Sequence, residues 1–425
     1  MPQRNTLLAL ASGAVLLATA CSDQNEPAAP SSQPSPSIHA PTQGRPDDPN
    51  ALAKGVRGFG GFFFDDAGTP TMYLKDAAQR GNAERALAPY LQKHGLAAGR
   101  IQVRPGRFGW DELDGWRTRV SAEVLRLPGA VFVDADEAGN QVLVGVERGK
   151  GGQARAALGR LGLPGSAVAV EETEPVTFAV GPKPKGKPGG GSLSLQGKVR
   201  PLRGGVQINF PGFLCTLGFS AKSGGTLSFI TNSHCTENQG GVDGTPYWQP
   251  LQSVDPTQIA VEVADPTYSS NLAGCPPGRI CRRADASRAS YQVAASDVAF
   301  GRIGRTQRPS RSSLGIVGDF TITAEGSAAA GQTVNKVGRT TGWSQGRVTN
   351  TCVDTDLSGT IITELCQNFV TATVGSGDSG SPVFQIGGGS NVTLVGILWG
   401  GSGSSVFVYS PITNVEQELG ALTTF

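Results

Sequence analysis

One serine lies in a segment whose neighbours suit it to act as a nucleophile. The segment is Gly377-Asp378-Ser379-Gly380-Ser381-Pro382. A serine hydroxyl is a weak nucleophile unless a base removes its proton and nearby dipoles stabilise the oxyanion that forms. Glycines on both sides allow a tight turn, which would aim the N–H groups of Gly377 and Ser379 into one small space. The segment is only moderately specific by itself, because a Gly-rich turn without any chemistry has the same composition.

The base that such a serine needs is most simply a histidine, and the chain has 3 His residues. His39 lies in a stretch rich in Pro and Ser, and His94 lies on the polar side of an expected helix. His234 ends the apolar run Phe229-Ile230-Thr231 and is followed by Cys235. We therefore expect His234 to be the base that serves Ser379.

A carboxylate should orient the imidazole and stabilise its charged form. Asp297 opens an otherwise apolar strand, and a buried carboxylate at that place needs a partner such as His234. Asp319 also adjoins an apolar stretch and is the alternative. We favour Asp297, so the predicted catalytic triad is His234, Asp297 and Ser379.

Length and composition bound the rest of the chain. It has 425 residues, 60 of them Gly, and a formal net charge of +2. The length favours two or three domains, and the near-neutral charge argues against a nucleic-acid partner. The many glycines fit a turn-rich, all-β protein better than a helical one. The predicted chemistry requires no metal and no cofactor, and nothing in the composition argues against a monomer.

The N-terminus is typical of an export signal. The apolar run Leu7–Ala18 is too short to span a bilayer, and small residues lead into Cys21. We predict that residues 1–20 are a lipoprotein-type signal peptide and that Cys21 is lipidated and attaches the protein to a membrane of the cell envelope. The alternative is an ordinary secretory signal with Cys21 as a bystander. Residues 21–50, rich in Pro, Ser and Ala, are expected to be a disordered tether.

The six other cysteines all lie in the second half of the chain. An exported protein meets an oxidising compartment, so they should form three disulfides. Fifteen pairings are possible. The simplest joins neighbours in the sequence: Cys215 to Cys235, Cys275 to Cys281, and Cys352 to Cys366. A zinc site is disfavoured because no two of these cysteines have the tight spacing of a zinc knuckle.

Changes in composition divide the remainder into three segments. Residues 51–180 predict a small α+β domain, with hairpins over 60–74 and 131–146 and helices over 77–95, 110–127 and 154–163. Residues 181–197 are a Gly/Pro/Lys-rich linker and a preferred site of proteolysis. Residues 198–425 show short alternating strands, which favour a sandwich or a pair of barrels. They end in a helix that leads into 415–419, with Ser410 as the expected N-cap and Pro411 as the expected first helical residue.

These motifs together resemble the chymotrypsin-like serine peptidases. The order His, Asp, Ser is that of the family, with Thr231-Asn232-Ser233-His234-Cys235 and the Ser379 segment as its motifs. The segments 215–220 and 338–343 are similar to the secreted bacterial branch, the alpha-lytic protease and streptogrisin group. The resemblance covers about residues 198–425. It implies two six-stranded antiparallel barrels, with His234 and Asp297 from the first and Ser379 from the second.

The resemblance also implies roles for residues around the triad. The N–H groups of Gly377 and Ser379 would form the oxyanion hole, and Cys215–Cys235 would brace the loop that carries His234. Asp378 would be buried and ion-paired with Arg339. The segment Leu398-Trp399-Gly400 would pair with an extended peptide substrate, and Thr373 and Val374 would line the side-chain pocket, with Gly400 at its wall.

Some positions depart from the family pattern. Thr373 replaces the acid that selects Lys or Arg, so trypsin-like specificity is not expected. Gly375 stands where a bracing cysteine is often found. The uncharged pocket favours apolar or small residues at the cleavage site.

Members of this bacterial branch are made with an N-terminal pro-domain that occupies the active site. The resemblance therefore implies that residues 51–180 are a pro-domain that is removed at the 181–197 linker, with self-cleavage as one route. The alternative is a stably attached accessory domain.

The sequence thus predicts a secreted serine endopeptidase whose partners are protein or peptide substrates and its own pro-domain. Its protease domain would be released from the cell envelope if the linker were cut. The alternative function is that of a surface binding protein on a catalytically idle protease fold.

Overall fold

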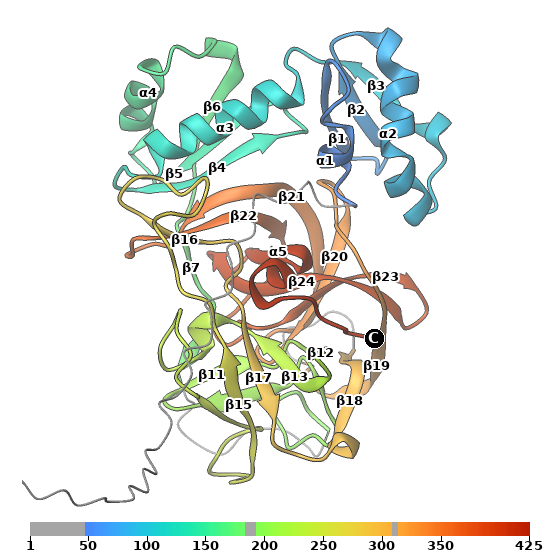
Figure 1. Ribbon diagram of the computed structural model, residues 1–425, viewed down its shortest axis with the longest axis vertical. Coiled ribbons are helices and arrows are strands. Elements are labelled where there is room, and N and C mark those ends of the chain that lie inside the picture. Colours follow the sequence, from blue (N-terminus) through green and yellow to red (C-terminus); the bar gives the residue numbers. More distant parts are fainter. Residues whose placement is uncertain (1–46, 183–192, 308–312) are drawn as a thin grey trace, which may run out of the picture. The chain divides into compact units, whose positions relative to one another are not determined.

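The computed structural model describes residues 47–182, 193–307 and 313–425 (Figure 1). The expected signal peptide, Cys21, most of the tether and residues 183–192 of the expected linker lie outside the described residues. Among the helices of the described segments, none is long and apolar enough to cross a membrane.

Residues 47–172, called here the N-terminal region, contain two units with the same order of elements. In each unit a β-hairpin is followed by a helix and then by a strand parallel to the second hairpin strand. The first unit follows a short helix and the second follows a long one. The elements are α1 (Pro49–Ala53), β1 (Phe59–Phe64), β2 (Pro70–Leu74), α2 (Arg80–Lys93), β3 (Gln102–Pro105), α3 (Trp110–Val124), β4 (Ala130–Asp136), β5 (Gln141–Val146), α4 (Gly151–Gly159) and β6 (Val168–Glu172).

Local sequence explains these elements well. The side chain of Glu112, in the first turn of α3, accepts a hydrogen bond from the N–H of Gly109 at 2.7 Å and so caps that helix. Asn140, at the turn between β4 and β5, has a φ of 50°, which asparagine tolerates better than most residues. The expected hairpins are present. Helices α2 and α3 are slightly shorter than expected, whereas α4 begins and ends earlier than the expected 154–163.

A short strand follows the N-terminal region and leads to an eight-stranded sheet. This sheet has the order β12-β13-β17-β15-β14-β10-β11-β8. The strands of this sheet are β8 (Gly181–Pro182), β10 (Gln207–Phe210), β11 (Phe213–Thr216), β12 (Phe219–Ser223), β13 (Thr226–Thr231), β14 (Pro246–Trp248), β15 (Gln258–Ala264) and β17 (Ser287–Tyr291). The same stretch of chain also contains β7 (Val176–Phe178), β9 (Leu202–Gly204) and β16 (Ile280–Arg282), which pair with strands of a second sheet. The segment 215–220 does not form a single strand, because it is divided between β11 and β12.

The last third of the chain builds the core of a second sheet. Its strands are β18 (Val298–Thr306), β19 (Ile316–Glu325), β20 (Thr333–Gly338), β21 (Gly342–Asp356), β22 (Ile362–Thr371), β23 (Pro382–Gly388), β24 (Asn391–Ser402) and β25 (Val406–Pro411), followed by helix α5 (Ile412–Leu419). Strand β22 pairs with both β21 and β25, so six strands of this sheet pair in a ring. The described residues 193–425 are therefore mostly β, as expected.

The N-cap expected for the last helix is wrong. Ser410 belongs to β25, Pro411 is the N-cap, and the helix begins at Ile412. The Oγ of Ser410 instead donates to Oε1 of Gln367 at 2.8 Å, which is a buried tertiary contact. A hydroxyl with a buried partner elsewhere is not free to cap a helix.

The second sheet continues into the N-terminal region. Strand β21 pairs with β4, at Asp354 with Val133 and at Thr355 with Phe132. The ring of Phe132 packs edge-on against Phe369 of β22, with 5.3 Å between centroids. The pairing makes the second unit of the N-terminal region an extension of the sheet.

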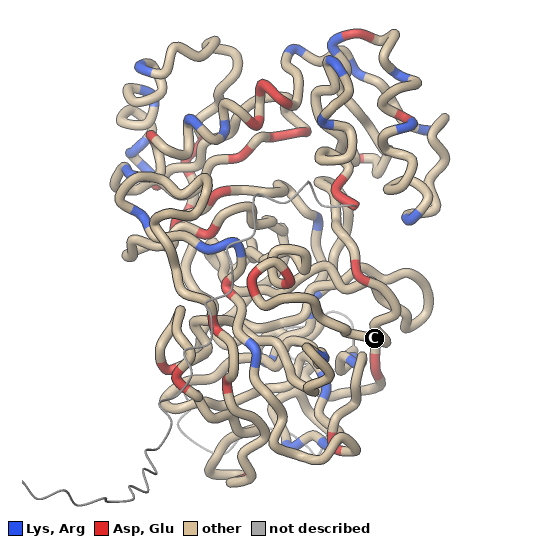
Figure 2. Tube along the Cα trace, viewed as in Figure 1, with Lys and Arg blue, Asp and Glu red and all other residues tan. Residues whose placement is uncertain are grey.

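Carboxyl groups are buried where β4 meets β21, and Figure 2 shows acidic residues along α3 and β4. Oδ2 of Asp134 accepts from Nδ2 of Asn350 at 2.9 Å, and Oε1 of Glu137 accepts from Oγ1 of Thr351 at 2.7 Å. Oδ1 of Asp134 is buried without a hydrogen-bond partner among the described residues. Such a contact is favourable only while the carboxyls remain uncharged.

Burial and the neighbouring Asp136 raise the pKa of Asp134 to about 8, although Asn350 and Arg117 oppose the shift. Burial and Asp134 raise the pKa of Glu137 well above its ordinary value. Asp354 lies in the same place and is ion-paired with Arg117. The β4–β21 contact therefore binds protons that the unfolded chain has released at the same pH.

Raising the pH should destabilise this contact. Between about pH 4 and pH 8 the unfolded chain binds fewer protons than the folded one, so the free energy of unfolding should fall by about 1.4 kcal/mol per pH unit for each proton. Asp134→Asn, which resembles the protonated acid, should reduce this slope. The measurement is urea unfolding of the intact chain at several pH values.

Exposed Asp66 offers the control, since Asp66→Asn should leave the slope of the parent chain unchanged. All chains would carry Ser379→Ala so that the nucleophile expected from the sequence cannot cut them. An Asp134→Asn slope equal to that of the parent would contradict the assignment.

Candidate active site

Two glycines with left-handed backbones shape the loop that carries Ser379. The φ angles are 100° at Gly377 and 90° at Gly380. A Cβ at Gly380 would lie 2.1 Å from the carbonyl oxygen of Thr216, which no side chain tolerates. The N–H of Thr216 in turn donates to the carbonyl of Ser379 at 2.7 Å. The glycines allow the loop to dock tightly against β11.

His234 reaches Ser379 from the other sheet. It follows β13 in a short 3₁₀ turn, Ser233–Cys235, and the Cys215–Cys235 disulfide ties this turn to β11. Nε2 of His234 lies 2.7 Å from Oγ of Ser379, which is hydrogen-bonding distance. The structure thus brings together the two residues that the sequence singled out, 145 positions apart.

The acid beside His234 is Asp285, and the expectation of Asp297 is wrong. Nδ1 of His234 and Oδ2 of Asp285 are in direct contact, and the N–H of His234 donates to Oδ1 of Asp285 at 3.1 Å. Asp297 opens β18, which pairs with β9 and β19 and not with the strand before His234. The alternative, Asp319, is ion-paired with Arg203 at 2.7 Å.

Strand register explains the position of Asp285. Strands β13 and β17 pair antiparallel with Thr231 opposite Ser287. Continuing that register by two residues places Asp285 opposite Ser233, the residue directly before His234. The carboxylate is fully buried, and its backbone N–H donates to Oγ of Ser410 at 3.2 Å. The sequence signal was a lone acid among alanines just before a short alternating strand, β17, which the sequence analysis did not identify.

Asp378 is buried and ion-paired as expected, but its partner is Lys336 and not Arg339. Nζ of Lys336 lies 2.9 Å from Oδ2 of Asp378, and both side chains are fully buried. Lys336 is on β20 and points inward, whereas Nε of Arg339 donates to Oε1 of Gln207 at 2.9 Å. Lys336 of β20 is therefore the ion-pair partner of Asp378, because the guanidinium of Arg339 is held by Gln207 of the other sheet.

Backbone groups complete the environment of Asp378. Its carboxylate accepts from the N–H groups of Thr340, Thr341 and Gly375 at 2.9–3.1 Å and from Oγ1 of Thr341 at 2.6 Å. Burial raises the pKa of this carboxyl, but Lys336 and the hydrogen bonds outweigh burial and hold the pKa below its ordinary value. The residue before Ser379 is therefore a charged anchor.

The N–H groups of Gly377 and Ser379 converge on one oxygen. Both donate to the carbonyl of Ala179, and the distance from the N of Ser379 is 3.4 Å. Ala179 lies between β7 and β8, in a segment that links the N-terminal region to the rest of the chain. The two groups expected to form the oxyanion hole thus hold a carbonyl of the chain itself.

The segment Val176–Pro182, called here the crossing strand, is paired on both sides of Ala179. Before it, Val176–Phe178 pairs antiparallel with Gly400–Ser402 of β24. The N–H of Ala179 donates to the carbonyl of Trp399 at 3.1 Å. After it, Gly181 and Pro182 pair with Leu214 and Phe213 of β11. This is the geometry of an extended peptide laid across Ser379.

The expected substrate-pairing segment is displaced by about one residue. Trp399 and Gly400 contact the crossing strand, whereas Leu398 is fully buried and its carbonyl accepts from the N–H of Gly380 at 2.8 Å. Gly401 takes part in its place. A Cβ at Gly400 would lie 2.8 Å from the carbonyl of Thr177, so glycine is needed where the two strands approach.

The expected pocket residues differ in exposure. Val374 is buried in one apolar cluster with Ala179, Ala372 and Phe407. A Cβ at Gly401 would lie 2.8 Å from Cγ1 of Val374, so little room remains on that side. Thr373 is only partly buried, and its carbonyl accepts from Oγ of Ser344 at 3.1 Å. The side chain of Ala179 is therefore surrounded by apolar side chains that leave little free space.

All three expected disulfides are present. They are Cys215–Cys235, Cys275–Cys281 and Cys352–Cys366. Cys215, Cys235 and His234 are near enough to one another to suggest a metal site. Two of these sulfurs are bonded to each other, so they are not thiolate ligands.

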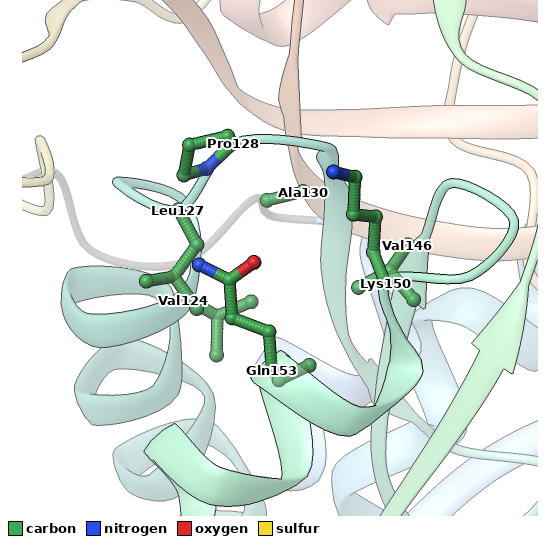
Figure 3. A pocket seen from close by; sticks show the side chains of 8 residues that line it. Val124, Leu127, Pro128, Ala130, Val146, Lys150 and Gln153 are labelled. Carbon is green, nitrogen blue, oxygen red and sulfur yellow. The ribbon is translucent and has the colours of Figure 1, made fainter.

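The N-terminal region contains a recess, and Figure 3 shows the side chains that line it. Its lining includes no Ser, Cys, His or carboxyl group. Its lining residues are Val124, Leu127, Pro128, Ala130, Val146, Lys150, Gln153 and Ala154.

Removing Lys336 should be far more damaging than removing Arg339. Lys336→Met leaves the buried Asp378 carboxylate without a counter-charge and should lower the free energy of unfolding by about 3–5 kcal/mol. Arg339→Met loses hydrogen bonds to neutral groups and should cost about 1–2 kcal/mol. Urea unfolding of the Ser379→Ala chain measures both. Equal losses would show that Lys336 is not the principal partner.

No protein-family model matches the chain. Several solved structures are similar to about half of it. Thermobifida fusca protease A has 24% identity, covers 52% of this chain and 98% of its own, and has a TM-score of 0.38. A glutamic acid specific serine protease has 21% identity, with 53% and 100% covered and a TM-score of 0.39. Cellulomonas bogoriensis chymotrypsin has 20% identity, with 52% and 97% covered and a TM-score of 0.37. About half of this chain is thus similar to bacterial serine proteases.

Proposed function

We propose that this protein is a serine endopeptidase with Ser379 as nucleophile, His234 as base and Asp285 as the acid that orients His234. One observation carries the proposal. The carbonyl oxygen of Ala179 accepts from the N–H groups of Gly377 and Ser379, while Oγ of Ser379 lies 2.7 Å from Nε2 of His234. A nucleophile, its base and two oxyanion donors therefore surround one peptide carbonyl.

The proposed reaction has two steps. Oγ of Ser379 attacks the carbonyl carbon while Nε2 of His234 takes the hydroxyl proton, and the two N–H donors stabilise the oxyanion. His234 then gives this proton to the leaving amine, which leaves an acyl ester on Ser379. Water, deprotonated by His234, hydrolyses the ester. Asp285 holds the Nδ1 proton and stabilises the imidazolium.

The two sheets suit this assignment. Asp285 and His234 come from elements next to the eight-stranded sheet, and Ser379 comes from a loop of the second sheet. We propose that these sheets are the two six-stranded barrels expected from the sequence. The pairing ring of the second sheet supports this reading, as does the separation of the triad between the sheets.

We further propose that the N-terminal region is a pro-domain that is removed at the Ala179–Val180 bond. The Ala179 carbonyl is the one held by the two oxyanion donors, so this bond is the one presented to Ser379. It lies just before the 181–197 linker in which cleavage was expected. The apolar groups around Ala179 favour small apolar residues at this position of other substrates.

Three disulfides in the described residues support export of the protein, because such bonds persist in oxidising compartments. Lipidation of Cys21 and attachment to the cell envelope remain part of the proposal.

Asp285→Asn and Asp297→Asn should separate the two candidate acids. Losing Asp285 leaves His234 without its orienting carboxylate and should lower kcat by about 10⁴-fold. Asp297→Asn, at a residue remote from the site, should stay within about twofold of the parent. The measurement is hydrolysis of a peptide anilide, with labelling of Ser379 by a fluorophosphonate as a second readout. A larger loss of kcat for Asp297→Asn than for Asp285→Asn would show that Asp297 is the acid that orients His234.

Self-processing should produce a fragment that begins with Val180. Intact mass and N-terminal sequencing of the purified chain are the measurements, and Ser379→Ala should remain whole. Ala179→Arg should slow the cut, because a long charged side chain does not fit the apolar cluster. A Ser379-dependent cut at another bond would contradict the assignment of Ala179.

A further inference from the structure

The ring of Phe178 lies on the imidazole of His234, the proposed catalytic base. Its centroid is 4.0 Å from that of the His234 imidazole, and the two planes are inclined by 21°, so the rings are stacked. The Trp399 ring meets the same phenyl ring edge-on, with 6.2 Å between centroids and an angle of 75°. One aromatic side chain of the crossing strand is therefore held between two others.

Both neighbouring rings are fixed by their own hydrogen bonds. Trp399 is fully buried, and its Nε1 donates to Oε1 of Gln367 at 2.9 Å. His234 is bonded at both ring nitrogens, to Asp285 and to Ser379. Because neither ring has to be ordered when a ligand arrives, the surface between them is preorganised for a flat group.

The backbone fixes where that group must come from. Phe178 pairs with Gly400, and the following residue, Ala179, presents its carbonyl to Ser379. An extended peptide bound in this register would always place the side chain before the cleavage residue against His234. The side chain one position earlier, Thr177, is exposed and contributes little to such selection.

We propose that the enzyme prefers peptides in which an aromatic residue precedes a small apolar cleavage residue, because the ring of that residue would stack on His234 beside Trp399 as Phe178 does. This inference deepens the proposed function and rests on it. It adds a specificity determinant that lies outside the side-chain pocket around Val374.

The chemistry of His234 gives the ring a role beyond binding. The imidazole becomes a cation as it takes the proton of Ser379, and the face of a phenyl ring attracts a cation. Stacking on His234 is therefore stronger in the transition state than in the bound substrate. Such an interaction raises kcat, whereas simple burial of the side chain lowers KM.

Peptide anilides of the form acyl-Val-Thr-Xaa-Ala test the subsite, because they copy the crossing strand. Xaa would be phenylalanine, cyclohexylalanine or alanine. Cyclohexylalanine is the matched control, since it has a similar size and greater apolarity but no π-face. The full-length chain would be expressed and allowed to process itself. Rates would be measured with the processed protein and normalised to the fraction of Ser379 that a fluorophosphonate labels.

The phenylalanine peptide should exceed the alanine peptide in kcat/KM by roughly 10- to 100-fold, and the cyclohexyl peptide by roughly three- to tenfold. The advantage over the cyclohexyl peptide should appear in kcat. Equal values for the phenylalanine and cyclohexylalanine peptides would overturn the aromatic subsite. Absence of labelling and of hydrolysis for all three peptides would instead overturn the proposed function.

Self-processing offers an independent readout. Phe178→Ala should slow the cut after Ala179 by about tenfold or more, whereas Phe178→Tyr, which keeps the ring, should restore it. Thr177→Ala is the control for a change in the same strand, and it should leave the rate within about twofold. Processing of Phe178→Ala at the parent rate would count against the subsite.

Discussion

The buried carboxylate of Asp378 holds the segment on which the proposed chemistry depends. It accepts from Lys336, from three backbone N–H groups and from a hydroxyl, all from two adjacent parts of one sheet. Five donors around one buried anion leave the loop little freedom to rearrange. The position of the neighbouring Ser379 is thereby fixed, and the N–H groups of Gly377 and Ser379 point towards the same carbonyl oxygen.

The loop that carries His234 is held by a different set of forces. A disulfide ties it to β11, and Asp285 accepts from both its backbone and its ring. His234 and Ser379 meet only because the two sheets pack through a shared apolar core that includes Ile230, Ile397 and Phe384. The site is thus an interface, and its geometry depends on the packing of the two halves.

The crossing strand, a segment of the protein itself, lies across the place where His234 and Ser379 meet. It pairs with β24 of the second sheet and with β11 of the first sheet, so it adds one strand to each sheet. The N-terminal region strengthens this attachment through the pairing of β4 with β21. The crossing strand is thus hydrogen-bonded at both ends and in the middle, as an extended peptide ligand would be.

Short motifs were enough to predict part of this site. Ser379 and His234 were found from their neighbours, because turn glycines, a strand end and an adjacent cysteine are local signals. The three disulfides joined cysteines near one another in the sequence, and short loops close most readily. The N-terminal hairpins and helices were also readable, because their hydrophobic periods and turn residues are local.

Tertiary structure decided what depends on register between distant strands. Asp285 faces His234, and Asp297 does not, because β17 pairs with β13 while β18 pairs elsewhere; each strand begins beside an acid, so local pattern could not separate them. Lys336 and Arg339 are three residues apart, and only the inward direction of one position on β20 selects the partner of Asp378. The sequence by itself thus determined which residue types could do chemistry. The pairing of strands, which satisfies backbone hydrogen bonds over long separations, decided which acid, which cation and which peptide bond they meet.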